Sequence, residues 1–194
     1  MGNKIQSTRA VPIAVVLVVA YGAALAQDLP AEPPVRQWRQ GFLKVELQPR
    51  LPDQTTAFFL ARGFSAVAAA DFAKRACVFR ATIGNAATNQ ADPVIDLDLK
   101  SWAVEQRGAS KSFPVQEDWD EEWQGTGVEE SARIAFRWAL FPPKQTFSAS
   151  DYNWGMLTFG LSPGSRFHLL LRWRENGKEQ EGRIDDLECA SHDS

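Results

Sequence analysis

Residues 166–188 read RFHLLLRWRENGKEQEGRIDDLE, and this stretch determines the fold class that the sequence predicts. Residues 166–174 alternate apolar and polar side chains, and residues 180–188 form a second run of the same kind. Asn176-Gly177 stands between them, and Asn-Gly between two alternating runs is the strongest short-range signal for a β-hairpin. The stretch therefore predicts two antiparallel strands.

Further runs with strand-like composition lie upstream at regular intervals, separated by turn residues. These runs span residues 42–47, 77–85, 95–106, 132–141 and 154–161. No helix alternates between the later runs, a pattern that favours antiparallel sheets over a parallel α/β sheet. The sequence predicts a mainly β fold, a single antiparallel β-sandwich over residues 37–190.

One segment has helical rather than strand-like spacing. Residues 55–76 are rich in alanine and carry apolar side chains at helical intervals, and Asp53 and Ser65 are placed as caps. Gly63 interrupts the pattern. We expect a short helical insertion between the first two strands, either one helix broken near Gly63 or two short ones.

The segment Leu161-Ser-Pro-Gly-Ser-Arg-Phe167 leads directly into an apolar strand. It resembles the corner that precedes a late strand in immunoglobulin-like and fibronectin-III-like sandwiches. Phe167 stands where those domains usually have tyrosine, so the hydrogen bond of a tyrosine corner is absent. The resemblance implies a sandwich of that architecture and implies no function, because such scaffolds host many.

The N-terminus has the parts of a secretory signal. Lys4 and Arg9 precede an apolar run over residues 11–21, and Ala24-Leu25-Ala26 provides the small residues of a cleavage site. We expect residues 1–26 to be removed and the protein to reach the periplasm or the exterior. An uncleaved membrane anchor is the alternative, although the apolar stretch is short against the roughly 20 residues that cross a bilayer.

Three prolines make residues 27–36 a spacer, and residues 191–194 are expected to be a flexible C-terminus. The chain has 21 Lys and Arg against 24 Asp and Glu, a formal net charge of −3. It lacks the basic excess of proteins that bind nucleic acids or anionic lipid.

The two cysteines, Cys77 and Cys189, lie near the two ends of the predicted sandwich. In an oxidising compartment such a pair most often forms a disulfide. Two free thiols, or a metal-binding thiolate at Cys189, are the alternatives.

Catalytic motifs are scarce. The only histidines are His168, inside an apolar strand, and His192, close to the C-terminus. No nucleophile elbow, zinc-protease motif, phosphate loop or dinucleotide fingerprint is present. The sequence favours a protein without catalytic residues or a cofactor, and a carboxylate-dependent hydrolase using Asp118 and Asp120 is a distant alternative.

A copper site would need soft ligands, and the candidates are scattered. They are His168, Met156, Cys189 and His192. A thiolate ligand at Cys189 and a disulfide at Cys189 exclude each other.

Residues 116–130, QEDWDEEWQGTGVEE, combine a dense set of acids with two tryptophans four residues apart. A helix would place Trp119 and Trp123 on one face and pin the segment to the core, whereas a loop would present both indoles beside Asp118 and Asp120. An exposed segment would suit a basic partner or stacking on sugar rings. Its spacing does not match a calcium-binding EF-hand.

Other aromatic residues fall into a predicted core set and a predicted exposed pair. Trp102, Trp138 and Trp173 lie in strand-like runs, where large rings fill the space between sheets. Tyr152 and Trp154 lie on a predicted turn and form a second candidate binding site.

Together these features predict an exported, non-catalytic accessory protein. It would contact another exported or membrane-bound protein through loops that carry Trp119, Trp123 and Trp154. A small-ligand module for carbohydrate or a metal ion is the alternative.

Overall fold

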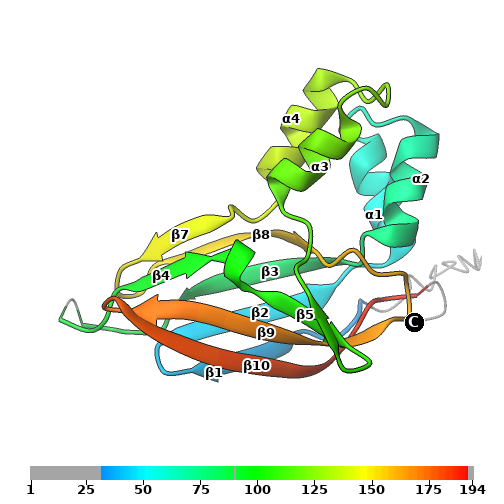
Figure 1. Cartoon of the computed structure of the whole chain (residues 1–194). Helices are drawn as coiled ribbons and strands as arrows, with labels where there is room; N and C mark the ends of the chain where they lie inside the picture. The colour runs from blue at the N-terminus through cyan, green and yellow to red at the C-terminus, as the bar shows by residue number, and fades with distance from the viewer. Residues whose placement is uncertain (1–31, 90, 192–194) are drawn as a thin grey trace, which may run out of the picture.

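The computed structural model describes residues 32–89 and 91–191. Over these residues the chain forms two antiparallel sheets and four α-helices, and the helices group together on one side of the sheets (Figure 1). The protein is therefore a mixed α/β protein in which the predicted antiparallel sheets are present. The predicted signal peptide, residues 1–26, and most of the predicted spacer lie outside the described residues.

Sheet A has four strands in the order β1-β2-β3-β8. Their bounds are β1 Arg36–Gln40, β2 Leu43–Pro49, β3 Val78–Asn85 and β8 Tyr152–Thr158. β2, β3 and β8 correspond to predicted strands, whereas β1 begins where the spacer was expected to end. Alternate side chains of β2, namely Leu43, Val45 and Leu47, are fully buried and form one wall of the core.

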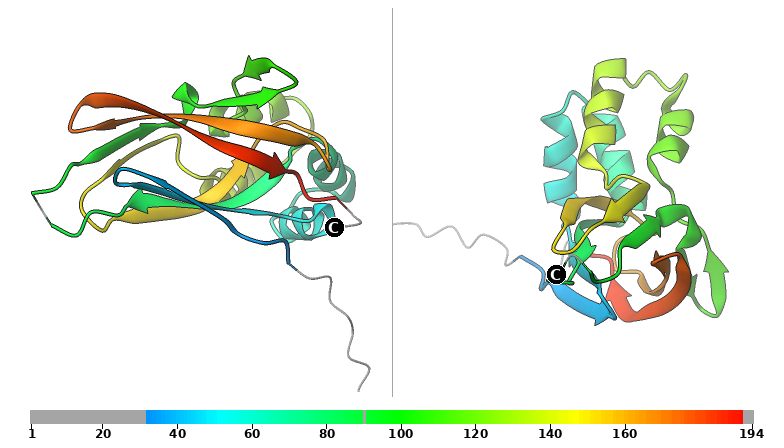
Figure 2. Two further views of the ribbon diagram at one scale, coloured as in Figure 1. Left: turned by 90° about the horizontal axis from the view of Figure 1, so that it is seen from below. Right: turned by 90° about the vertical axis from the view of Figure 1, so that its left-hand side faces the viewer.

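Sheet B is built around the predicted hairpin, β9 (Arg166–Glu175) with β10 (Lys178–Glu188). Two short strands, β4 (Ile95–Asp98) and β5 (Ala103–Gln106), pair with successive halves of the other edge of β9. β7 (Lys144–Phe147) lies beside β4 and β6 (Ala109–Lys111) lies beside β5, while β10 pairs only with β9. The two sheets stack face to face (Figure 2).

The single strand predicted over residues 95–106 is thus two strands, divided by a 3-10 helix, Leu99–Ser101. At this break the buried Trp102 indole donates its Nε1 hydrogen to the Arg172 carbonyl oxygen at 2.9 Å. The indole therefore provides the hydrogen bond to this β9 carbonyl group that a backbone amide would provide in a regular strand pair.

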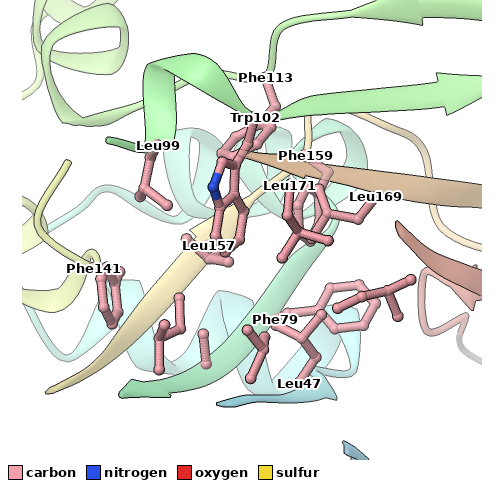
Figure 3. Packing of buried hydrophobic residues seen from close by; sticks show 14 of the residues in the cluster. Leu47, Phe79, Leu99, Trp102, Phe113, Phe141, Leu157, Phe159, Leu169 and Leu171 are labelled. Atoms are coloured by element: carbon pink, nitrogen blue, oxygen red, sulfur yellow. The ribbon is translucent and has the colours of Figure 1, made fainter. Parts of the chain in front are cut away.

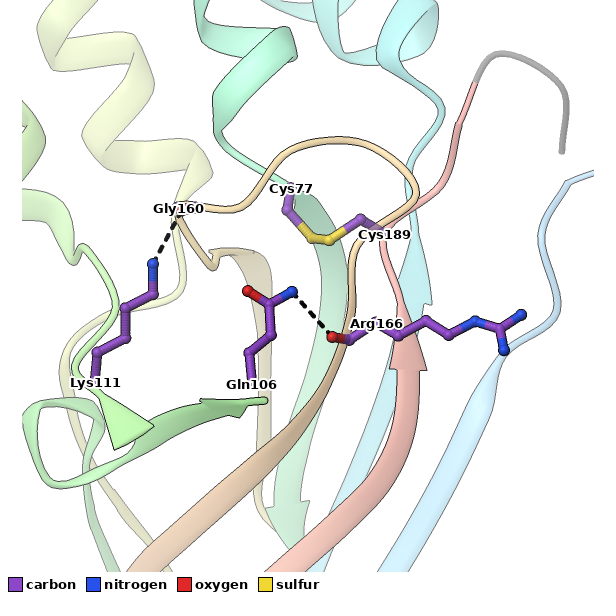
Figure 4. The surroundings of a disulfide bond; sticks show 6 residues. All are labelled: Cys77, Gln106, Lys111, Gly160, Arg166 and Cys189. Atoms are coloured by element: carbon purple, nitrogen blue, oxygen red, sulfur yellow. Dashed lines mark hydrogen bonds between the residues drawn. A yellow bond between two sulfur atoms is a disulfide. The ribbon is translucent and has the colours of Figure 1, made fainter. Parts of the chain in front are cut away.

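The main core lies between the sheets and contains Trp102, as predicted (Figure 3). Trp173 belongs to the same buried cluster, also as predicted. A disulfide joins Cys77, just before β3, to Cys189, just after β10, with the two Cα atoms 5.3 Å apart (Figure 4). The predicted pairing is confirmed. The disulfide ties one sheet to the other, and it indicates an oxidising, extracytoplasmic compartment.

The predicted helical insertion is two helices, α1 (Pro52–Leu60) and α2 (Ala66–Arg75). Gly63 lies between them with φ of +89°, a conformation that favours glycine. Ser65 caps α2 as predicted, its side chain accepting a hydrogen bond from the Ala68 amide at 3.2 Å. Asp53 lies in the first turn of α1 and does not occupy the N-cap, which is Leu51.

The strand predicted over residues 132–141 is wrong, because this segment is helix α4, Glu130–Ala139. Ala132, Phe136 and Leu140 recur every four residues and are buried together, which suits a helix. Helix α3, Gln116–Trp123, precedes α4. A second helical pair is therefore inserted between β6 and β7, and the chain carries more helix than the predicted mainly β fold.

The four helices enclose a second, aromatic core, which contains Phe59, Phe72, Trp119, Trp123 and Phe136. Val78 of β3 and Met156 of β8 belong to the same cluster. The helices therefore rest on the outer face of sheet A at one end of its strands and leave the other end uncovered. No helix within residues 32–89 or 91–191 combines the length and apolar character needed to cross a bilayer.

Candidate binding surface

The uncovered part of the outer face of sheet A is the candidate site. Phe79, Ala81 and Ile83 of β3 point into the main core, so the residues that alternate with them point outward. Three cross-strand rows result: Gln48, Arg80 and Met156; Glu46, Thr82 and Trp154; Lys44, Gly84 and Tyr152. Each row is ordered from β2 through β3 to β8.

Two large aromatic side chains occupy the β8 side of these rows. Tyr152 is 62% exposed and Trp154 is 68% exposed. Gly84 makes the close pairing at Tyr152 possible, because a Cβ at Gly84 would stand 2.6 Å from the Tyr152 Cβ. The Lys44 Nζ lies 5.8 Å from the centre of the Tyr152 ring on the far side of Gly84, within cation–π range.

Trp154 also lies on the open edge of sheet A. Its amide donates to the Asn153 side-chain oxygen at 2.8 Å, a bond made within β8 itself. β8 pairs with β3 on one side only, and Leu140 and Phe141 cover its other side near Met156.

Trp138, in the last turn of α4, is 86% exposed, so the predicted burial of this ring between the sheets is wrong. The chain after α4 forms a parallel bridge between Leu140 and Met156. Trp138 and Trp154 each lie two residues from a member of that bridge. We call Trp138, Tyr152 and Trp154 the aromatic surface, at the junction of the helices with sheet A.

A group of three arginines lies near this face, and one of them, Arg80, is in the row next to Trp154. The guanidinium carbons of Arg50 and Arg62 lie 5.4 Å and 3.2 Å from the centre of the Phe58 ring. Arg50 follows Gln48 on the same face, because its amide donates to the Val78 carbonyl oxygen while Gln48 is paired with Arg80, so Arg50 and Arg80 lie in successive rows. Burial is the largest cause of a lowered pKa for Arg50; the charges of Arg80 and Arg62 lower it further, and the charge of Glu32 raises it. No sequence motif marks this cluster, because Arg50 follows β2, Arg62 follows α1 and Arg80 lies in β3.

Trp119 and Trp123, predicted as binding residues if exposed, are buried, with exposed fractions of 2% and 6%. Their rings stack with centres 5.6 Å apart, and the Trp119 Nε1 donates to the Thr158 hydroxyl at 2.8 Å. The alternative in which both indoles pin a helix to the core therefore matches the structure. Neither ring has an exposed face to offer a partner.

The acids beside these tryptophans have structural roles. Asp118 accepts a hydrogen bond from the Val115 amide at 2.8 Å, at the start of α3. Asp120 pairs with Arg133 and Arg137 of α4. The Asp120 contacts join α3 to α4, and Asp120 also lines a hollow of about 530 Å³ together with Glu117, Glu121 and Arg137.

The predicted soft-metal ligands do not come together. Cys189 is in the disulfide, Met156 is buried under the helices, and His168 lies on sheet B beside Asp185. His192 lies outside the described residues. Among residues 32–89 and 91–191, no group of three or more His, Cys, Asp or Glu side chains is arranged to hold a metal ion.

A groove of about 870 Å³ crosses the outer face of sheet B over β4, β7, β9 and β10. Most of its charges are already matched in pairs, namely Arg172 with Glu181, Arg174 with Glu179, and Lys144 with Asp98, and Asp96 accepts a hydrogen bond from the Thr146 hydroxyl. A ligand would have to displace these contacts, so the groove is a weaker candidate than the face of sheet A.

No protein-family model, curated protein or solved structure matches this chain.

Proposed function

We propose that this protein is an exported, non-catalytic binding protein that contacts another exported or membrane-bound protein through the aromatic surface. The observation that carries the proposal is the exposure of Trp138, Tyr152 and Trp154 at one junction of the fold. Most other aromatic side chains of the described residues are buried in the two cores.

The chemistry of this surface supports protein binding. Trp, Tyr and Arg dominate the residues that contribute most to protein–protein affinity. Tyr and Trp offer a large contact area with few rotatable bonds, so little conformational entropy is lost on binding. Tyr152 and Trp154 lie on a strand paired with β3, which holds them in position before a partner arrives.

Export is supported by the disulfide and by the signal-like N-terminus. Residues 1–26 carry the positive start, the apolar run and the small residues of a secretory signal. Periplasm or exterior is therefore the proposed location. Mass spectrometry of protein from the exported fraction would test it, and an intact N-terminus starting at Met1 would favour the membrane anchor.

We also propose that the sheets form an immunoglobulin-like or fibronectin-III-like scaffold. If β2, β3 and β8 correspond to strands A, B and E, then β10, β9, β4 and β7 correspond to G, F, C and C′. The disulfide departs from the usual B–F bridge, and two helical pairs are insertions. An experimental structure with a different strand order would contradict this assignment.

The proposed function is tested with a photo-crosslinking amino acid at position 154, in cells that export the protein. The matched control carries the same amino acid at Val67, which is 81% exposed on α2, away from the aromatic surface. We expect one defined protein to be crosslinked from position 154 and not from position 67.

The crosslinked protein is then purified and titrated with the wild type and with Trp154→Ala. We expect the variant to keep the wild-type melting temperature and to bind about tenfold or more weakly, because a central exposed tryptophan is the type of residue that dominates an interface. Equal affinities, or the same crosslinks from both positions, would refute the proposal.

A further inference from the structure

The positive charges near the aromatic surface are only partly offset within the fold, and Glu46 is the acid in the row next to Arg80. Among the described residues, no acid forms an ion pair with Arg50, Arg62 or Arg80. The acid whose charge acts on Arg50 is Glu32, and the Glu32 carboxylate accepts a hydrogen bond from Gln48. The Arg50 Nε is buried and has no acceptor among the described residues.

The arginines of sheet B behave differently. Arg166, Arg172, Arg174 and Arg183 each pair with a glutamate at 2.9–3.1 Å. The arginines of sheet B are thus paired within the sheet, whereas Arg50, Arg62 and Arg80 have no carboxylate partner among the described residues and could pair with a carboxylate of another molecule. An unpaired guanidinium close to other cations gains more from a carboxylate than one that already has a partner.

Two of these three arginines, Arg50 and Arg62, are also held in position by Phe58. Phe58 lies within cation–π range of both Arg50 and Arg62, and the Arg62 guanidinium donates to the Phe58 carbonyl oxygen at 3.0 Å. Arg80 lies in the row next to Trp154 on the same face. A carboxylate bound at Arg80 would therefore lie beside an exposed indole.

We infer that the outer face of sheet A binds an acidic segment of a partner polypeptide, with Arg50, Arg62 and Arg80 taking its carboxylates and Tyr152 and Trp154 contacting its apolar side chains. This inference rests on the proposed function and specifies the partner's chemistry. A guanidinium group can donate two parallel hydrogen bonds to the two oxygens of a carboxylate, so the contact depends on orientation as well as on charge.

A polypeptide fits this face better than an anionic membrane or a nucleic acid. The chain as a whole carries a formal charge of −3, so it is not attracted over long range to a highly charged polyanion. On the outer face of sheet A, Arg80 lies in the row next to Trp154 and Lys44 lies in the row of Tyr152, a mixture of cations and aromatic rings of the kind found at protein–protein interfaces.

The experiment uses the full exported chain and a fluorescein-labelled peptide of about a dozen residues, rich in glutamate with a central leucine. A second peptide replaces every glutamate with glutamine. We expect the glutamate peptide to bind and the glutamine peptide to bind about tenfold or more weakly, with the difference shrinking as salt is raised.

Arg80→Gln is the principal variant, because Arg80 is exposed and its removal leaves both cores intact. Arg174→Gln on sheet B is the matched control. We expect Arg80→Gln to weaken binding of the glutamate peptide several-fold and Arg174→Gln to leave it unchanged. Melting temperatures of both variants exclude loss of fold as the cause.

Three outcomes would overturn the inference: equal binding of the two peptides, equal effects of Arg80→Gln and Arg174→Gln, or binding to phosphatidylglycerol vesicles rather than to the peptide. If Arg80→Gln does not change binding of the glutamate peptide or of the crosslinked partner, while Trp154→Ala still lowers the affinity for that partner, the inference fails and the proposed function stands. If neither substitution affects the partner, both fail.

Discussion

Trp119 and Trp138 lie on neighbouring helices and have opposite surroundings. Trp119 is 2% exposed, is surrounded by Phe72, Trp123 and Phe136, and donates a hydrogen bond to Thr158. Trp138 is 86% exposed. The same residue type therefore supports the fold at one position and is available for contact at the other.

Substituting each tryptophan by alanine separates these roles. Trp119→Ala should lower the free energy of unfolding by about 3–5 kcal/mol, because it leaves a cavity in the helical core and removes the hydrogen bond that the Thr158 hydroxyl accepts, although that hydroxyl still donates to the Pro114 carbonyl oxygen. Trp138→Ala should change it by less than about 0.5 kcal/mol. Urea unfolding measures both, and comparable losses would contradict the assignment of these side chains.

The four-residue spacing of Trp119 and Trp123 predicted their burial only if the segment is a helix. Two tryptophans four residues apart share a face if the segment is a helix, and the sequence left the loop open as an alternative. For residues 132–141 the helical pattern was obscured, since Ile134 and Trp138 put apolar side chains on the exposed face as well. Apolar residues on both faces resemble a buried strand, and only packing against the other helices distinguishes the two.

At the scale of elements, the β9–β10 hairpin was the most predictable part of the fold. Asn176-Gly177 specifies its turn, and Asn176 has φ of +48°, as this turn chemistry requires. What the sequence did not indicate is the irregular register between Ile184 and Leu187. There Arg183 forms a bidentate pair with Glu105 of β5 and also contacts Asp185, which lies beside His168.

This network gives the hairpin a dependence on pH. The hydrogen bond from Arg183 is the largest cause of a lowered pKa for Glu105 in the folded protein. The ionised carboxylate therefore stabilises the fold above its ordinary pKa of 4.5, and this contribution is lost as pH falls through the lowered folded pKa.

Glu105→Gln should accordingly melt at a lower temperature than the wild type near neutral pH and lose less stability on acidification below about pH 4. Glu179→Gln is the control, since the Arg174–Glu179 pair is more exposed than the Arg183–Glu105 pair. Melting temperatures measured across this range test the claim, and parallel pH profiles for wild type and Glu105→Gln would show that the pair does not act in this way.

At the scale of the molecule, the sequence indicated part of the candidate site. Tyr152 and Trp154 were named from one contiguous stretch with turn-like composition, although they begin strand β8. Arg50, Arg62 and Arg80 were not named, because they come from three separate segments and only the sheet register and the packing of α1 bring them together. A surface assembled across elements leaves no spacing in a single sequence.

The disulfide joins the two sheets, so its removal tests the whole molecule. Cys77 and Cys189 are 112 residues apart, and closing a loop of that length restricts the unfolded chain by about 4–5 kcal/mol in the chain-entropy model. The variant carrying Cys77→Ala and Cys189→Ala should lose stability of that order in urea unfolding. The wild type should lose a similar amount after reduction, while the variant should not respond to reductant.

Removal of the disulfide should affect binding much less than stability, provided that binding is measured without denaturant, where the variant is folded. The aromatic surface lies where the helices meet β8, whereas the disulfide joins the start of β3 to the end of β10, so a folded variant should keep its affinity for the partner. Loss of affinity without loss of folded structure would mean that the bond holds the two sheets in the geometry the surface needs. Unchanged stability in the variant would mean that the unfolded chain remains compact enough for the bond to remove little of its entropy.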